Sequence, residues 1–307
     1  MSDTGYRATP LAGGVGSEIA GLDIQSEIPD QTAAELRALW LEHGMLYFRG
    51  MGTSPEVQLH LSRCFGDLEA HPIPKFRHPD WPELILLTNQ DGPTSPVYDF
   101  GDGTAIHGRI PWHIDLAFKT TPNAGALLRM VRKTKDGGQT GWLDAAKAYD
   151  TLPDTTKARI DNLEAVYLFR AGLEEMRFSA PEGVRLDARK DSYPHFPPVA
   201  NPLVWNHPAT GRRVLNLSLL NIDGVLGLAR ADGDALIEEL VEHIADPAFS
   251  YVHQWQENDM VLWDNRRMMH CTLGHPVDQV RVVHRTTIAG SVAMGRELAS
   301  SELEEMA

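Results

Sequence analysis

The sequence predicts a mainly β protein, a sandwich or jelly roll with a few flanking helices. From residue 110 onward, short runs of β-branched, aromatic and other apolar residues recur between turn-forming residues. Helical periodicity is confined to a few segments. The glycine-rich motifs that bind dinucleotides or phosphates in α/β folds do not occur. Together these observations favour stacked or rolled antiparallel sheets over βαβ units.

Two helices are predicted near the start of the chain. Residues 30–43 carry apolar side chains at helical spacing, and Asp30 or Thr32 is the expected N-cap. Residues 54–66 begin with serine and proline and end in glycine, so Ser54 is the expected N-cap of the second helix. These cap residues define where each helix is expected to start.

Single strands and irregular segments surround these two helices. Short strands are predicted at residues 44–50 and 84–88. Four prolines exclude regular structure from residues 71–83. Residues 89–108 are rich in glycine and proline, which predicts a mobile surface loop.

The remaining strands follow one another toward the end of the chain. They are predicted at residues 112–118, 125–131, 140–145, 165–169, 203–207, 213–218, 251–256, 259–264 and 281–290. Helices are predicted to interrupt them at residues 146–162 and 229–245. Residues 170–200 lack periodicity, and we interpret them as an insertion in a single domain that spans residues 1–307. This insertion and the loop at 89–108 are expected to act as active-site lids.

Composition and charge limit the classes of partner. The 307 residues include 42% apolar and 23% charged residues, an ordinary balance for a globular protein. The net charge of −14 offers no basic excess to nucleic acid or an anionic membrane. No apolar run approaches the roughly 20 residues of a membrane helix. Cys64 and Cys271 form no disulfide framework and no signal-peptide pattern is present, so a cytoplasmic protein is expected.

A histidine and an aspartate stand two residues apart in the apolar stretch "WHIDLAF". On a strand, His113 and Asp115 project from the same face. With one further histidine they would form the facial triad that binds non-haem iron(II) and leaves coordination positions open. The alternative is a polar pair at a strand edge. A second His-x-Asp pair at residues 78–80 is set aside, because neighbouring prolines disfavour a strand there.

The stretch "MVLWDNRRMMHCTLGHPVDQVRVVHRTTIAG", residues 260–290, supplies further candidates. His270 lies beside a predicted strand and is the candidate third ligand. Arg281 and Arg285 are four residues apart, which places both on one face of the following strand. Guanidinium groups bind carboxylates bidentately and keep their charge, so this pair predicts a carboxylate site. The alternative is a surface pair that bridges acidic side chains.

A zinc site is an alternative interpretation of this stretch. Cys271 adjoins His270, and His275 follows five residues after it. No Cys-x-x-Cys pair accompanies them, so Cys271 is expected to be a packed thiol. Asn265 is expected to stabilise a turn.

Six motifs in a fixed order make the sequence resemble the taurine dioxygenase and phenoxyacetate dioxygenase (TauD/TfdA) family of Fe(II)- and 2-oxoglutarate-dependent oxygenases. They are "FGDLEAHP" (65–72), "WHIDLAF" (112–118), "GGQTGWLDAAKAYDTL" (137–152), "HPATGRRVL" (207–215), "WDNRRMMH" (263–270) and "RVVHRTTIAG" (281–290). The resemblance covers nearly the whole chain. It implies a double-stranded β-helix, a cupin-like jelly roll with helices packed on one sheet.

The resemblance also implies roles for individual residues. His113, Asp115 and His270 match the iron ligands of the family. Thr140 matches a hydroxyl that contacts the carboxylate of 2-oxoglutarate (α-ketoglutarate). Arg281 matches the arginine that pairs with the distal carboxylate of this co-substrate.

Three further residues match positions near the primary substrate in the family. Arg285 matches an arginine close to both the co-substrate and an anionic substrate group. His71 falls where some members place a substrate-contacting histidine. Arg109 stands where some members carry a small polar side chain that touches the substrate. It is either a second anion clamp or a solvent-exposed side chain.

The resemblance implies hydroxylation of a C–H bond in a small, anionic organic substrate, with use of O2 and release of succinate and CO2. The Asp115 carboxylate implies oxygen insertion, since related halogenases lack it. One alternative is the same oxidative chemistry used for desaturation, ring formation or epimerisation. Another is a non-redox metal-binding jelly roll that binds a ligand. A homo-oligomer, dimer or tetramer, is expected, without nucleic acid or membrane partners.

Overall fold

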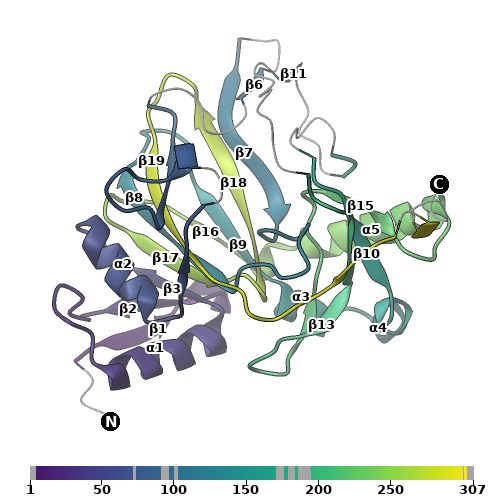
Figure 1. Ribbon diagram of the computed structural model, residues 1–307, viewed down its shortest axis with the longest axis horizontal. Helices are drawn as coiled ribbons and strands as arrows, with labels where there is room; N and C mark the ends of the chain where they lie inside the picture. The colour runs from purple at the N-terminus through teal and green to yellow at the C-terminus, as the bar shows by residue number, and fades with distance from the viewer. Residues whose placement is uncertain are drawn as a thin grey trace.

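The computed structural model describes residues 5–71, 74–90, 97–99, 103–170, 176–178, 184–185, 195–299 and 301–302. Its centre is a jelly roll of two large β-sheets that share a core, with helices on the outside (Figure 1). The predicted mainly β fold with flanking helices is confirmed. Within these ranges, no helix is both long and apolar enough to cross a membrane.

The larger sheet contains eight strands. Their order is β1–β2–β3–β17–β8–β19–β4, and β5 also pairs with β19. The pairing is antiparallel except between β2 and β3. The strands are β1 (Arg7–Pro10), β2 (Ser17–Ala20), β3 (Met45–Phe48), β4 (Leu68–Glu69), β5 (Leu84–Thr88), β8 (Gly125–Arg132), β17 (Met260–Asp264) and β19 (Val282–Ile288).

The second large sheet contains six strands in the order β11–β6–β7–β18–β9–β16, and two smaller sheets accompany it. Its strands are β6 (Val97–Asp99), β7 (Ala105–His113), β9 (Thr140–Asp144), β11 (Val184–Arg185), β16 (Ser250–His253) and β18 (Met268–Pro276). The smaller sheets are β15–β10–β12–β20 and the hairpin β13–β14. Their strands are β10 (Glu164–Tyr167), β12 (Val199–Pro202), β13 (Val204–Asn206), β14 (Arg213–Leu215), β15 (Ile222–Val225) and β20 (Arg296–Glu297).

Strand alternation divides the apolar side chains between two layers. In β17, Val261 and Trp263 point into the core between the large sheets. There the Trp263 ring packs against the Trp142 ring of β9, with 5.9 Å between centroids. Met260 and Leu262 of the same strand belong to the layer under the helices. Both faces of β17 are therefore buried.

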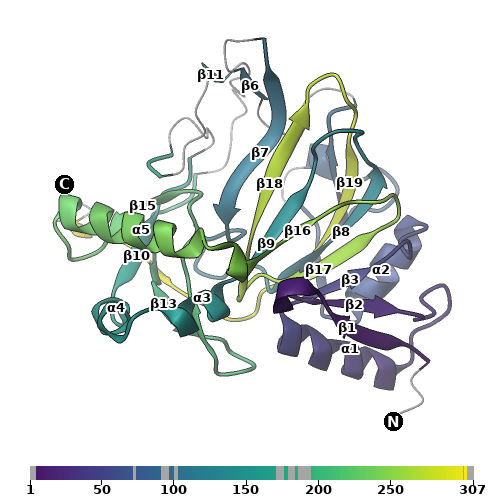
Figure 2. The same cartoon turned by 180° about the vertical axis from the view of Figure 1, so that it is seen from behind.

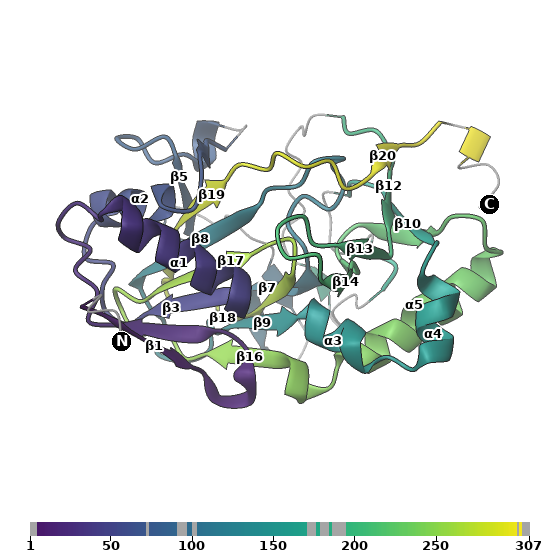
Figure 3. The same ribbon diagram turned by 90° about the horizontal axis from the view of Figure 1, so that it is seen from below.

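Helices cover two flanks of the roll. The first pair, α1 (Asp30–His43) and α2 (Pro55–Arg63), packs on the outer face of the eight-stranded sheet. Three others lie on the opposite flank, where α5 packs on β15 (Figures 2 and 3). They are α3 (Ala145–Thr151), α4 (Asp154–Ile160) and α5 (Arg230–Ile244). Short 3-10 turns occur at Ala12–Gly14, Pro74–Phe76 and Pro247–Phe249.

Two helix predictions need correction. Pro29 precedes α1 without a side-chain cap, so neither of the predicted N-cap residues caps this helix. Ser54 does cap α2, because its hydroxyl accepts a hydrogen bond from a backbone N–H of the first turn. The predicted helix at 146–162 is divided into α3 and α4, since Pro153 lacks the N–H that a continuous helix needs.

Several strand predictions around β7 need correction. The predicted loop at 89–108 contains β6 and the first part of β7, which pairs with β18. Residues 91–96 and 100–102 of this loop lie outside the described residues. The predicted strand at 112–118 ends early, at His113, and the chain then turns. The strand β18 was not predicted, and neither were β1, β2, β4, β11, β12, β15 and β20. The predicted strand at 84–88 matches β5 at both ends, and the remaining predicted strands have counterparts with shifted ends.

A buried ion pair ties α1 to the second sheet. Arg267 donates to the two carboxylate oxygens of Asp144 at 3.0 and 2.6 Å, and to the carbonyls of Leu41 and Glu42 at the end of α1. The same carboxylate accepts hydrogen bonds from two N–H groups that open α3. The two side chains are only 8% and 4% exposed, so each charge depends on the other for compensation.

Replacement of Arg267 by methionine is expected to lower the free energy of unfolding by about 3–5 kcal/mol, because Asp144 stays buried without a partner. Urea denaturation followed by circular dichroism measures the change. The control is Arg159→Met, which breaks an ion pair with Glu239 whose side chains are 51% and 45% exposed. It is expected to cost less than about 1 kcal/mol. Equal losses in both variants would contradict the proposed role of the buried pair.

Candidate metal centre

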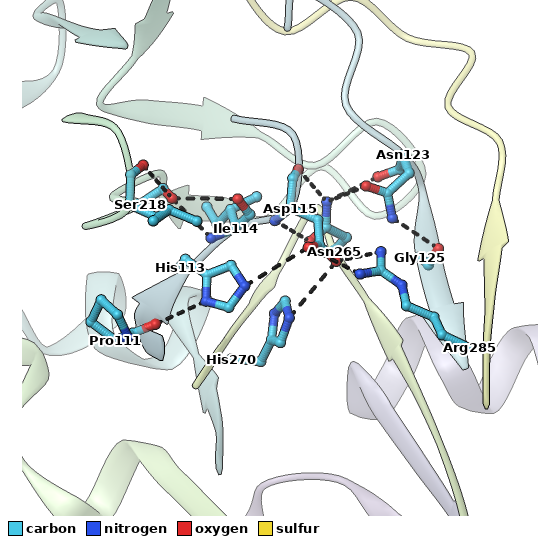
Figure 4. Close-up of polar contacts among 11 residues, drawn as sticks. Pro111, His113, Ile114, Asp115, Asn123, Gly125, Ser218, Asn265, His270 and Arg285 are labelled. Carbon is cyan, nitrogen blue, oxygen red and sulfur yellow. Dashed lines mark hydrogen bonds and ion pairs between the residues drawn. The ribbon is translucent and has the colours of Figure 1, made fainter. Parts of the chain in front are cut away.

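Three side chains meet at one end of the jelly roll. His113 is the last residue of β7, Asp115 lies in the turn after it, and His270 lies on β18 directly opposite His113. One ligand atom from each residue lies within 4.8 Å of the others. The two Nε2 atoms stand 3.8 Å from different oxygens of the Asp115 carboxylate (Figure 4). The imidazoles and the carboxylate therefore face a common point.

The geometry that brings these groups together is not the one the sequence suggested. His113 and Asp115 do not alternate along one strand, since β7 ends at His113. The following turn includes Leu116 with a φ of 56°, a left-handed conformation that is uncommon for a leucine. The turn redirects the carboxylate toward the histidines.

Asn265, between β17 and β18, fixes the backbone of that turn. Its Oδ1 accepts a hydrogen bond from the Asp115 N–H at 3.0 Å, and its Nδ2 donates to the Asp115 carbonyl at 3.1 Å. The same amide donates to the Asn123 carbonyl, and Ser218 binds both backbone groups of Ile114 (Figure 4). The sequence indicated only a turn at Asn265, because its contact with Asp115 spans 150 residues.

Arg285 on β19 neutralises the Asp115 carboxylate. Its Nη2 and Nη1 donate to the two carboxylate oxygens at 2.6 and 3.3 Å. Burial alone would raise the pKa of Asp115, but Arg285 first, and then His270 and His113, lower this pKa to about 2. The carboxylate is therefore ionised across the physiological pH range.

The two histidines are held in the neutral form that binds metals. Burial lowers the pKa of His113 and lowers the pKa of His270 well below its ordinary value. The Nδ1 of His113 lies 2.8 Å from the Pro111 carbonyl and donates to it, which leaves the Nε2 lone pair free toward the centre. Within the described part of the chain, the buried Nδ1 of His270 has no hydrogen-bond partner.

The guanidinium of Arg281 forms a second cationic position, beside the hydroxyl of Thr140. Arg281 directly precedes β19, and burial lowers the pKa of its guanidinium to about 10. Its Nη2 lies 3.5 Å from the Thr140 hydroxyl, which also accepts a hydrogen bond from the Trp255 indole. The buried Nε of Arg281 has no hydrogen-bond partner among the residues described. A buried cation in this state is suited to an anionic ligand.

The two arginines line separate cavities. A cavity of about 270 Å³ contains Asp115, Arg285 and His71 in its wall. A smaller one of about 90 Å³ is lined by Arg281 together with polar side chains of β5, β7 and β18. A register shift between Val282 and Val283 interrupts the regular alternation that predicted both arginines on one strand face.

Arg109 and Cys271 lie outside both of these cavities. Arg109 is exposed and lines a third hollow together with Trp112, Cys271 and Leu219. Burial raises the pKa of the Cys271 thiol to about 12, so this thiol stays protonated and is a poor zinc ligand. In the described ranges, the His113, Asp115 and His270 group is the one cluster with metal-ligand geometry.

The predicted lid at 170–200 is described only in part. Phe196 lies in the wall of the 270 Å³ cavity, together with Phe169 at the end of the preceding segment. Residues 171–175, 179–183 and 186–194 lie outside the described residues.

Two histidines and one carboxylate gathered within a jelly roll form a candidate mononuclear metal site with the donor set of a facial triad. The family model described as "Taurine catabolism dioxygenase TauD, TfdA family" matches residues 7–287. The chain therefore belongs to the TauD/TfdA family. Relatives in this family are named α-ketoglutarate-dependent dioxygenases, so the chain is an oxidoreductase of that class.

Individual relatives match over almost their full length. The (S)-phenoxypropionate/α-ketoglutarate dioxygenase of Sphingobium herbicidovorans is 29% identical over 96% of this chain and 98% of its own. An alkylsulfatase of Acinetobacter baylyi is 30% identical over 93% of this chain and 85% of its own. The crystal structure of AAD-2 with Mn(II) and N-oxalylglycine matches with a TM-score of 0.74 and 26% identity, over 94% and 99% of the two chains. The expected double-stranded β-helix is the fold shared with these proteins.

Replacement of Asn265 by alanine is expected to weaken Mn(II) binding by about 10- to 100-fold, because the turn that carries Asp115 loses its anchor. Electron paramagnetic resonance of free Mn(II) measures this affinity in the metal-free protein. The matched control is Asn216→Ala, since Asn216 is equally buried and donates to the Pro202 carbonyl away from the metal centre. A similar loss of affinity in both variants would indicate general destabilisation instead.

Proposed function

We propose that the chain is an Fe(II)- and 2-oxoglutarate-dependent dioxygenase that hydroxylates a C–H bond of a small organic anion and releases succinate and CO2. The observation that carries the proposal is the convergence of His113, Asp115 and His270 within 4.8 Å beside a cavity large enough for a small organic molecule. Membership of a family of α-ketoglutarate-dependent dioxygenases supports the same reaction class.

The donor set fits iron(II). Two imidazoles held neutral and one carboxylate held ionised are ready to bind a divalent cation without prior loss of a proton. Three protein ligands leave positions open, as expected of a catalytic and not a structural site. When bound, iron(II) would supply the activation of O2 for oxidation of a C–H bond.

The protein's own residues bind and orient the two organic ligands in this proposal. Arg281 and Thr140 bind the distal carboxylate of 2-oxoglutarate, which compensates the buried guanidinium. Arg285 and His71 contact the primary substrate, since both line the cavity that contains Asp115. We leave Arg109 out of the substrate site because it is exposed and lines a different hollow.

Several observations favour an anionic substrate. Relatives are named for phenoxypropionate and alkyl sulfate chemistry, and the cavity beside Asp115 carries cationic side chains. We further propose that the protein acts in the cytoplasm, where its free thiols Cys64 and Cys271 stay reduced, and that it forms a homo-oligomer. Light scattering tests the oligomeric state.

The purified protein is expected to convert 2-oxoglutarate to succinate in the presence of Fe(II) and ascorbate, with faster release when a substrate is added. Asp115→Ala and His270→Ala are expected to reduce succinate release to background, as measured by chromatography. His60→Ala, at an exposed histidine of α2, serves as the control. Full activity in the two triad variants would refute the assignment. Mass spectrometry of the product distinguishes hydroxylation from desaturation, ring formation or epimerisation.

Replacement of Arg281 by methionine is expected to raise KM for 2-oxoglutarate by about 10- to 100-fold, because a charge-assisted contact with the distal carboxylate is lost. Initial rates of succinate formation at varied 2-oxoglutarate measure this change. Arg109→Met, at an exposed position, is expected to leave this KM unchanged. An unchanged KM in Arg281→Met would show that the co-substrate carboxylate binds elsewhere.

A further inference from the structure

We propose that Trp255 is a positioning residue for the co-substrate, because its indole N–H turns the hydroxyl proton of Thr140 toward the distal carboxylate of 2-oxoglutarate. This role rests on the dioxygenase activity and the co-substrate site proposed above, and it specifies how that site selects a carboxylate. Trp255 falls within the predicted strand at 251–256, and nothing in the sequence marked it as part of the site.

The indole of Trp255 is held at the start of β9. The strand β16 pairs with β9 so that His253 lies opposite Thr140, and Trp255 follows two residues later. Its ring is 7% exposed and belongs to the core between the two large sheets. It meets the Trp142 ring at 6.1 Å between centroids and the His253 ring at 4.6 Å, both edge-on. Because the N–H lies in the plane of a rigid ring held by such contacts, its direction is fixed.

The Thr140 hydroxyl receives two hydrogen bonds and can give one. A hydroxyl has two acceptor lone pairs and a single donor proton, whereas indole and guanidinium nitrogens only donate. Trp255 donates to the Thr140 oxygen at 3.1 Å, and Arg281 donates to it at 3.5 Å. Both lone pairs are therefore engaged, and neither donor can accept the proton. The hydroxyl has no further hydrogen-bond partner in the described part of the chain, so its proton is available to a ligand.

A carboxylate is the acceptor that these surroundings favour. Thr140 is fully buried, and the Arg281 guanidinium beside it takes part in no ion pair with the residues described. A negatively charged oxygen satisfies both the unshared hydroxyl proton and the uncompensated guanidinium, and such charge-assisted hydrogen bonds are stronger than neutral ones. A neutral ligand would leave the guanidinium without compensation.

Without the indole N–H, the Thr140 hydroxyl loses its preferred orientation. The proton can then rotate into the direction that Trp255 now occupies, and a lone pair of the hydroxyl would face the incoming carboxylate. Binding must then reorient the hydroxyl, which costs part of the interaction. The expected loss of affinity for 2-oxoglutarate corresponds to one ordinary hydrogen bond, about 3- to 10-fold.

Calorimetric titration of 2-oxoglutarate into the Mn(II)-loaded protein measures this affinity apart from turnover. Trp255→Phe is expected to raise Kd for 2-oxoglutarate by about 3- to 10-fold and to leave Kd for 2-oxopentanoate unchanged. The second ligand has the same chain length, with a methyl group in place of the distal carboxylate. During turnover, KM for 2-oxoglutarate is expected to rise in the same proportion while kcat stays unchanged.

Trp142→Phe is the matched control for the loss of an indole. Trp142 lies in the same core, and its buried N–H has no hydrogen-bond partner among the residues described. This variant is expected to bind both ligands as the wild type does. Replacement of Trp255 by 3-benzothienylalanine keeps the shape of the ring and removes only the N–H. It is expected to match Trp255→Phe, and it tests the hydrogen bond if that variant does not fold.

A double-mutant cycle tests whether the indole acts through the hydroxyl. Thr140→Val is expected to weaken binding of 2-oxoglutarate by about 10- to 100-fold, because a hydrogen bond to a charged group is lost. In that background, Trp255→Phe is expected to cause no further loss, since the hydroxyl that it orients is absent.

The positioning role is overturned if Trp255→Phe and the benzothienyl analogue bind 2-oxoglutarate as tightly as the wild type. It is also overturned if Trp142→Phe loses as much affinity, if 2-oxopentanoate is weakened equally, or if Trp255→Phe lowers the affinity of Thr140→Val further. Unchanged affinity for 2-oxoglutarate in both Thr140→Val and Arg281→Met would show that the co-substrate carboxylate binds elsewhere. That result would overturn the proposed co-substrate site together with the role of Trp255.

Discussion

The buried carboxylate of Asp115 is the constraint on which the site depends. An ionised carboxylate removed from water must be compensated by a charge or by several hydrogen bonds. Arg285 supplies that charge from β19, while the end of β7 and β18 supply two neutral imidazoles. These strands belong to different sheets, so the group exists only when the jelly roll is closed. The three ligands therefore come together only when the two large sheets pack against each other.

The two arginines at β19 lie beside two different cavities. Arg281 and Arg285 stand four residues apart, yet they line different cavities, one polar and small and one aromatic and larger. The register shift at the start of β19 gives the two guanidinium groups different surroundings. The two guanidinium groups therefore offer two separate positions for anionic groups.

The sequence predicted elements well where periodicity was strong. The helix at 30–43 and the strand at 84–88 have the predicted ends, because local apolar patterns and end signals define such elements. The stretch 112–118 was misread as a strand. Its alternating apolar residues fit a strand, but a single side chain, Asn265, holds Asp115 in a turn from 150 residues away. A local sequence pattern contains no information about a contact between residues that lie so far apart in the chain.

The sequence by itself determined the family, the residue types of the candidate metal site and the mainly β architecture, because those follow from motif order, donor chemistry and hydrophobic patterning. Only the tertiary structure decided that Arg285 pairs with Asp115 and that Arg109 lines a hollow separate from the cavity beside Asp115. The physical reason is that strand pairing and turns bring distant side chains together. The direction in which each one points depends on the whole roll.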